Sequence, residues 1–160
     1  ESYYFSRYAH IWGWASWRRT WGKYDVGLKQ WPKVKKEGWL FDIFKEKKLV
    51  KYWENVFDTV FNNRIDTWDH QLTFATLINS MLNIMPNNNL ISNIGFDGNA
   101  THTKKTNLLS NIPNVEITFP LTHPKIIIRN TLADNITEKE QFLTHFIATR
   151  IIAKIKDVLL

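Results

Sequence analysis

The chain has no cysteine and only 6 glycines among its 160 residues. Without cysteine it has no disulfide, no thiol nucleophile and no thiolate metal ligand, a composition that suits a cytoplasmic protein. The sequence has no glycine-rich phosphate loop, no zinc-ligand spacing and no serine-hydrolase motif. No apolar run reaches the roughly 18–20 residues that a membrane-spanning helix needs.

The first residues, Glu1 to Tyr4, show neither an initiator methionine nor the basic and apolar regions of a signal peptide. We therefore expect the chain to begin partway through a longer protein. Hydrophobic residues make up 44% of the sequence and charged residues 22%, which is typical of a globular protein. We expect residues 1–160 to form a single domain.

The net charge is +6, and lysines gather between Lys29 and Lys51. Such a segment attracts anionic partners, which include a nucleotide diphosphate, a nucleic acid and an anionic membrane surface. A lysine-rich surface that is simply solvated is the alternative. Charge alone does not decide among them.

The chain is rich in tryptophan. It has 8 tryptophans, and 4 of them lie between positions 12 and 21. Gly13 separates Trp12 from Trp14. Indole rings offer flat faces for sugar rings or bases, and a glycine lets the backbone approach a ligand closely. Trp12, Gly13 and Trp14 are therefore a candidate sugar platform; the alternative is a small aromatic core at the start of a helix.

Apolar spacing predicts the main helices. Between Lys47 and Phe61 apolar residues recur every three or four positions, which predicts a helix with one buried face. A second helix is expected to begin near Asp66 or Thr67, with one face that extends from Trp68 to Leu82. Residues 16–24 suit a short helix with Trp17 stacked on Trp21, and residues 28–46 suit loops and irregular turns.

The remaining predictions concern strands and the C-terminal helix. Strands or extended segments are expected at residues 1–12, 82–86, 90–94, 115–119 and 126–128. Residues 97–110 are polar and predict a long surface loop. The sequence from Thr137 to Glu140 matches a capping box, so we expect the last helix to follow it, with Phe142 and Leu143 on its apolar face. Basic residues lie among its apolar ones, so this helix either packs on the domain or rests on a membrane.

Two residues are candidates for chemistry. Asp69 follows Trp68 at the start of a predicted helix, where a rigid element and a large ring would hold a carboxylate as a base. The alternative is structural: with Asp66 as the N-cap, Asp69 would occupy N3 and stabilise the helix N-terminus. His102, in the polar loop, is suited to a metal or a phosphate, or is simply solvated.

Three separated blocks of sequence carry a resemblance to a known family. The first covers residues 3–19 (Tyr-Tyr-Phe-Ser-Arg-Tyr, then His-Ile-Trp-Gly-Trp-Ala-Ser-Trp-Arg-Arg), the second residues 66–71 (Asp-Thr-Trp-Asp-His-Gln), and the third residues 86–103. In this order they resemble the second half of bacterial nucleotide-sugar glycosyltransferases of the hemolytic-protein HlpA-like family, which have the GT-A fold. The similarity extends in outline to N-acetylglucosaminyltransferase I, whose Trp-Asp-Asp-Trp segment supplies its base. The second Asp and second Trp are His70 and Leu72 here.

The resemblance implies a mixed α/β fold in which helices pack on a few short strands. It implies that the chain is the acceptor-side half of an inverting enzyme and is inactive without the nucleotide-binding half. Asp69 would be the base, His102 would face the metal or the diphosphate, and Trp12, Gly13, Trp14 and Trp68 would contact substrate. The partners would be a nucleotide-sugar donor and a carbohydrate acceptor.

The metal-binding Asp-x-Asp motif of the GT-A fold is missing, because no two aspartates stand two residues apart. Mn²⁺ or Mg²⁺ is therefore expected only together with the absent half. Two other classes remain open. A carbohydrate-binding module would use the tryptophans without a base, and a nucleic-acid-binding domain, the less favoured of the two, would use the lysines between Lys29 and Lys51.

Overall fold

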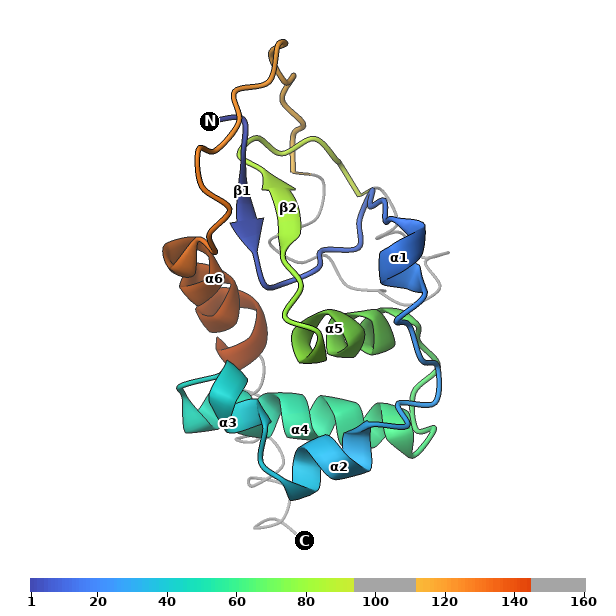
Figure 1. The fold of residues 1–160 in the computed structure, drawn as a ribbon. Coiled ribbons are helices and arrows are strands. Elements are labelled where there is room, and N and C mark those ends of the chain that lie inside the picture. Colours follow the sequence, from blue (N-terminus) through green and yellow to red (C-terminus); the bar gives the residue numbers. More distant parts are fainter. Residues whose placement is uncertain (94–111, 145–160) are drawn as a thin grey trace, which may run out of the picture.

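The computed structural model describes residues 1–93 and 112–144, and these form a mixed structure of helices and a small two-stranded sheet (Figure 1). The coarse α/β class is therefore confirmed. The elements in chain order are β1 (Tyr3–Ser6), α1 (Arg18–Trp21), α2 (Trp31–Lys36), α3 (Leu40–Ile43), α4 (Lys47–Phe61), α5 (Asp69–Ile78), β2 (Asn83–Pro86), α6 (Thr131–Thr137) and the π-helical turn η1 (Glu138–Leu143).

The helices α2 to α5 lie below the sheet in Figure 1, and α1 and α6 lie on either side of it. β1 and β2 pair antiparallel with Tyr4 opposite Met85, and α5 lies between this sheet and α4 (Figure 1). The helix α2 lies below α4 in this view, and α3 lies beside one end of α4. A parallel bridge between Phe5 and Arg129 brings the segment before α6 alongside β1. Residues distant in sequence thus surround the two strands.

The core is built on α4, whose predicted bounds are confirmed. Leu49, Trp53 and Phe57 lie on its buried face and are at most 3% exposed. Trp53 stacks on Phe57 with ring centroids 5.3 Å apart, so aromatic side chains fill much of this interior. The 3.6-residue stripe identified the helix because burial of one face is what holds a surface helix to a core.

The prediction of loops over residues 28–46 is wrong, because the segment contains α2 and α3. Pro32 lies in the first turn of α2, where its missing N–H costs no intrahelical hydrogen bond. Trp31, Val34 and Leu40 are buried at 2% exposure or less. Tertiary burial of these three side chains supports helices too short to be stable alone.

The start of α5 also differs from the prediction. The helix begins at Asp69 with Trp68 as its N-cap residue, so Asp69 occupies N1 rather than N3. The helix ends at Ile78, and Leu82 lies beyond it at 36% exposure. Residues 71–77 are all buried, because α5 is enclosed between α4 and the sheet rather than exposed along one face.

The strand predictions are confirmed for β1 and β2 and wrong elsewhere. Of 90–94, residues 90–93 are described and have no regular structure, and neither do residues 115–119. Over 126–128 the three isoleucines are 69–75% exposed and form no strand. A strand needs a partner as well as an apolar pattern, and of these segments only residue 129, just beyond the isoleucines, bridges to β1.

The capping box at Thr137 is not used as one. Thr137 is the last residue of α6, which begins at Thr131, and the cap is Asn130, whose side chain accepts a hydrogen bond from the Ala133 N–H at 3.0 Å. Phe142 and Leu143 do pack against the core, as predicted. The predicted helix beyond residue 144 lies outside the described residues. Among the described helices none is long and apolar enough to cross a bilayer.

Candidate functional site

Four aromatic rings from two distant parts of the chain meet at the surface. Trp14 stacks on Trp68 with ring centroids 4.9 Å apart and an interplanar angle of 27°. Trp21 lies 5.9 Å from Trp14 and stacks on Tyr24 at 4.6 Å. We call Trp14, Trp21, Tyr24 and Trp68 the aromatic cluster. Trp21 was expected to stack on Trp17, but Trp17 instead lies beneath the guanidinium of Arg19, 4.9 Å from its ring centroid.

The tryptophans of the aromatic cluster are well exposed. Trp14 retains 38% of its accessible surface, Trp21 45% and Trp68 37%, whereas the core residue Trp31 retains 1%. Exposed large rings stacked on one another are rare away from binding surfaces, because stacking does not compensate for leaving so much apolar area in water. This exposure favours the interpretation as a platform over that as a small core. Trp12, at 41% exposure, is not one of the four rings.

Gly13 has a conformational role of its own. Its φ of +62° lies in the left-handed region, which side chains other than glycine rarely adopt. A Cβ at this position would lie 2.4 Å from Cδ1 and 2.6 Å from Cγ1 of Ile91. The glycine thus turns the backbone between Trp12 and Trp14 and lets it pack on Ile91. A close approach to ligand is an additional prediction that these contacts do not test.

Asp69 lies beside the aromatic cluster at the N-terminus of α5. Its Oδ1 accepts a hydrogen bond from the Thr67 hydroxyl. The Thr67 carbonyl in turn accepts one from Nε2 of Gln71 at 2.7 Å, which fixes the segment that precedes the helix. The Oδ2 of Asp69 lies 4.0 Å from Nδ1 of His70, too far for a hydrogen bond. With 27% of its side chain exposed, the carboxylate is positioned yet accessible to solvent.

The negative charge of Asp69 raises the pKa of two tyrosines. Burial raises the pKa of Tyr24 above its ordinary value, and the negative charge of Asp69 raises it further. The same two causes, in the same order, raise the pKa of Tyr52 to about 12. Tyr24 belongs to the aromatic cluster and Tyr52 to α4. The carboxylate is therefore close enough to act on both sides of the start of α5.

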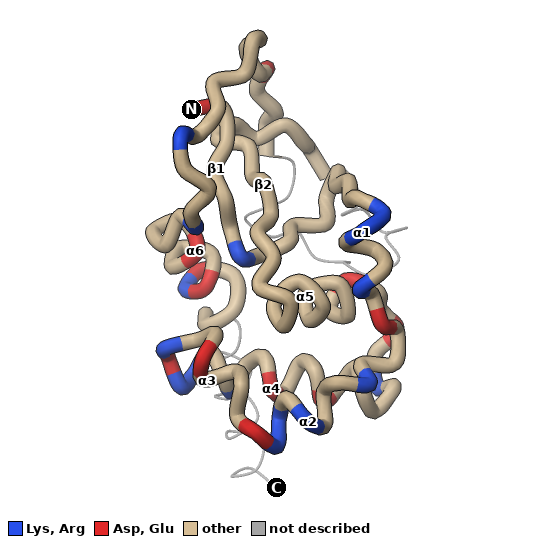
Figure 2. The backbone as a smooth tube through the Cα atoms, in the orientation of Figure 1, with Lys and Arg blue, Asp and Glu red and all other residues tan. Residues whose placement is uncertain are grey.

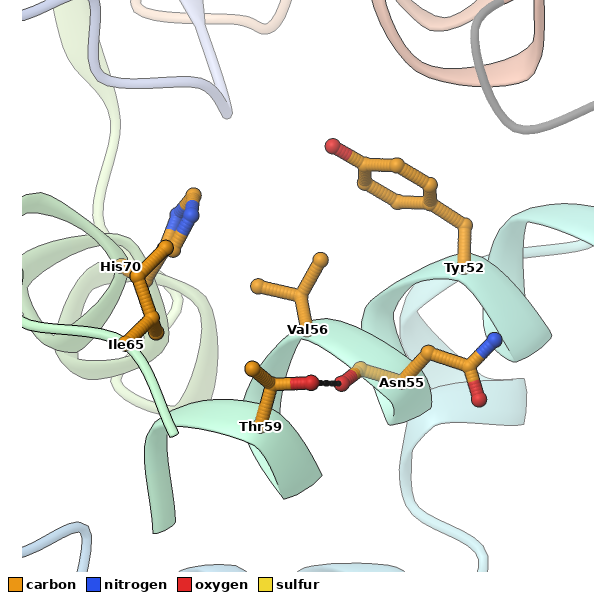
Figure 3. A pocket seen from close by; sticks show the side chains of 6 residues that line it. All are labelled: Tyr52, Asn55, Val56, Thr59, Ile65 and His70. Carbon is orange, nitrogen blue, oxygen red and sulfur yellow. Dashed lines mark hydrogen bonds between the residues drawn. The ribbon is translucent and has the colours of Figure 1, made fainter. Parts of the chain in front are cut away.

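A hollow of about 200 Å³ opens beside the same helix start (Figure 3). Four of its residues come from one face of α4, and Tyr52 and His70 stand on opposite sides of Val56. The only hydrogen bond drawn among the lining residues runs from the Thr59 hydroxyl to the Asn55 carbonyl, at 2.7 Å. The lining residues are Tyr52, Asn55, Val56, Thr59, Ile65 and His70.

A second group of titratable residues ties α6 to β1. Asp134 is 1% exposed and accepts a 2.6 Å hydrogen bond from the Ser6 hydroxyl. The Nε atoms of Arg7 and Arg129 lie 3.8 and 3.5 Å from its Oδ2. Tyr8 donates a 2.7 Å hydrogen bond to Glu138. Because the buried carboxylate is paired and hydrogen-bonded from several sides, this cluster has a structural explanation and leaves little room for a ligand.

The predicted metal ligand cannot be placed, because His102 lies outside the described residues. Within residues 1–93 and 112–144 no three His, Asp or Glu side chains come close enough to hold a metal ion. Of the other predicted site residues, the structure brings Trp14, Trp68 and Asp69 together.

The sequence interpretation missed Trp21, Tyr24 and Tyr52 as neighbours of this site. One signal was available for Tyr52: with Val56 and Thr59 it has the helical spacing of a second face of α4, away from the core stripe. Trp21 and Tyr24 depend on how the chain folds back between α1 and α5, which local spacing does not reveal.

Comparisons of the chain with models of known protein families, with curated proteins and with solved structures returned no match.

Proposed function

We propose that this chain is the acceptor-side part of a nucleotide-sugar-dependent glycosyltransferase of the GT-A type, which transfers a sugar to an acceptor hydroxyl with inversion. The observation that carries the proposal is the stacked pair of Trp14 and Trp68 beside the accessible carboxylate of Asp69. The sequence resemblance supports the same assignment. Two of the three blocks that carry the resemblance, residues 3–19 and 66–71, contain Trp14, Trp68 and Asp69.

The aromatic cluster would bind the acceptor sugar. The apolar face of a pyranose ring stacks on an indole because C–H groups meet a π face, while hydroxyls around the ring rim remain free for hydrogen bonds. Trp14 and Trp68 each leave over a third of their surface accessible, so a sugar could lie against the pair without unfolding it. A platform built from two segments also holds the sugar in one orientation relative to Asp69.

Asp69 would act as the general base. As the acceptor oxygen attacks the anomeric carbon of the donor, the bond from that carbon to the diphosphate breaks and the hydroxyl proton passes to the carboxylate. The Thr67 hydroxyl occupies Oδ1, so Oδ2 is the atom assigned to the proton. The diphosphate would leave with the bonding electron pair. No step is assigned to a metal, and the role of His102 stays a prediction.

The test is Asp69→Asn in the full-length protein. Asn keeps the shape of the side chain and can still accept the Thr67 hydrogen bond, but it cannot take a proton from a hydroxyl. We expect transfer to fall by about 10²–10⁴-fold with little change in melting temperature. Transfer is measured as nucleoside diphosphate release from UDP-, GDP- and dTDP-hexoses with mixed disaccharide acceptors. Asp42→Asn, an exposed carboxylate on α3 away from the aromatic cluster, is the matched control.

Two results would contradict the proposal. Near-normal transfer in Asp69→Asn would place the base elsewhere. Sugar binding that depends on Trp14, with no transfer from any donor in the wild-type protein, would favour the carbohydrate-binding module instead. That second function has one observation in its favour, since an exposed aromatic platform can bind sugar without a base.

A further inference from the structure

The turn between α2 and α3, together with the start of α3, exposes two large aromatic side chains outside the candidate site. Gly38, with a φ of +71°, makes the turn. Trp39 is 38% exposed and Phe41 is 54% exposed, whereas Leu40 between them is buried at 2%. The buried leucine anchors the turn to the core while its two neighbours face outward. Two large exposed apolar side chains that lie two residues apart form a small apolar patch.

The same turn is surrounded by positive charge. Residues 29–51 contain 8 lysines and 3 acidic residues. Figure 2 shows the basic residues along α2 and between α3 and α4. The ammonium of Lys33 lies 5.2 Å from the ring centroid of Trp39. Lys35 is already paired with Asp58 at 2.6 Å, but Lys36, Lys47 and Lys48 are exposed on this side. Apolar rings are thus combined with a local excess of cations.

We propose that this surface, made of Trp39, Phe41 and the lysines of residues 33–48, docks the protein onto an anionic lipid bilayer. Trp and Phe side chains enter the boundary between headgroups and acyl chains, and lysines above them meet the lipid phosphates and carboxylates. Neither force alone anchors a protein well, whereas apolar insertion and charge attraction together do. The proposal does not depend on the proposed transferase activity.

The geometry favours a bilayer over a nucleic acid. Single-stranded nucleic acids bind by stacking bases on open aromatic faces. Here the ammonium of Lys33 lies over the ring of Trp39, so one face of that ring is already occupied by the chain itself. Insertion into lipid requires only apolar volume at the turn. In addition, α3 and α1 lie on opposite sides of the fold in Figure 1, so docking through α3 would leave α1, which carries Trp21, uncovered.

The experiment is co-sedimentation of the full-length protein with vesicles. Phosphatidylcholine vesicles containing roughly one third phosphatidylserine are compared with pure phosphatidylcholine at low and high salt. We expect binding to the anionic vesicles that salt weakens, and little binding to the neutral ones. The charge variant is Lys47→Glu with Lys48→Glu, and the aromatic variant is Trp39→Ser with Phe41→Ser. Each variant should weaken binding at least about fivefold. For the charge variant, fivefold is the effect of losing a single lysine near an anionic surface, so it is a lower bound.

The matched controls are Lys125→Glu with Lys139→Glu, which reverse two exposed lysines outside this surface, and Trp17→Ser, which changes the exposed tryptophan that precedes α1. Trp39→Phe should retain binding, which separates apolar insertion from a folding defect. Equal binding to neutral and anionic vesicles, or equal losses in the controls, would overturn the proposal. So would a single-stranded DNA oligonucleotide that binds the same lysines and displaces the vesicles.

Discussion

Replacement of Gly13 by alanine tests how the backbone presents the tryptophans on either side of it. The residue has a φ of +62°, and a Cβ there would lie within 2.6 Å of two side-chain carbons of Ile91. Gly13→Ala therefore introduces two separate costs, one from the backbone conformation and one from the clash. Each can be estimated and each can be relieved independently.

The left-handed conformation costs an alanine about 1–2 kcal/mol. Real Cβ atoms essentially never come within 3.0 Å of another heavy atom, so Ile91 has to move. Overpacking typically costs about 1–3 kcal/mol, and the lower end applies because Ile91 is 40% exposed and can turn toward solvent. The free energy of unfolding should therefore fall by about 2–3 kcal/mol in total.

The assay is urea denaturation of the wild type, Gly13→Ala, Ile91→Ala and the double variant. Removal of Cδ1 and Cγ1 of Ile91 takes away the clash but not the backbone strain. The double variant should recover about 1 kcal/mol of the expected sum, a coupling that a double-mutant cycle isolates. A loss below about 0.5 kcal/mol in Gly13→Ala, or strict additivity of the two single changes, would refute the reasoning.

Two further predictions test the aromatic cluster and the group of titratable residues that includes Asp134 and Glu138. Trp14→Ala should abolish sugar binding with a small loss of stability, because the ring is 38% exposed. Trp31→Ala, at a side chain that is 1% exposed, should instead lower the free energy of unfolding by about 3–5 kcal/mol. Thermal melts, together with binding to a panel of methyl glycosides, separate the two outcomes. Burial raises the pKa of Glu138, against the opposing effects of the Tyr8 hydrogen bond and of Arg7, so the folded state holds this proton more tightly than the unfolded state. The free energy of unfolding should therefore fall as pH rises from the ordinary glutamate value through the raised one, and Glu138→Gln should flatten that part of the pH profile; an unchanged profile would contradict this.

The parts of the fold that local pattern determines were predicted well. The stripe from Lys47 to Phe61 is α4, and the short apolar segment that proline closes at Pro86 is β2. The failures concern segments whose structure depends on a distant partner. Residues 28–46 become helical because Trp31 and Leu40 have a core to enter, which no local signal states. The isoleucines before Arg129 have strand propensity but no ladder to join among the described residues.

The candidate site likewise contains residues that the sequence predicts and neighbours that it does not. The residue types at Trp14, Trp68 and Asp69 were chosen from their chemistry and from the resemblance, and all three meet in space. Just before Trp14 the backbone turns at Gly13 and passes close to Ile91. Contacts of that kind are set by the three-dimensional path of the chain. Residue spacing alone therefore does not predict that Tyr24 and Tyr52 lie near the Asp69 carboxylate.

The structure also bears on the two interpretations of Asp69. A helix-stabilising carboxylate would stand at N3 and bond to the backbone of the first turn, with a capping residue before it. Asp69 instead stands at N1, the Trp68 side chain makes no capping bond, and the hydrogen bond that Oδ1 accepts comes from the Thr67 hydroxyl. What remains of a helix-stabilising role is the interaction of its charge with the helix dipole, typically 0.3–1 kcal/mol, or about 0.6 kcal/mol here at partial exposure. A loss of that size is small beside the 3–5 kcal/mol range of a buried aromatic truncation, so Asp69→Asn is a test of chemistry rather than of folding.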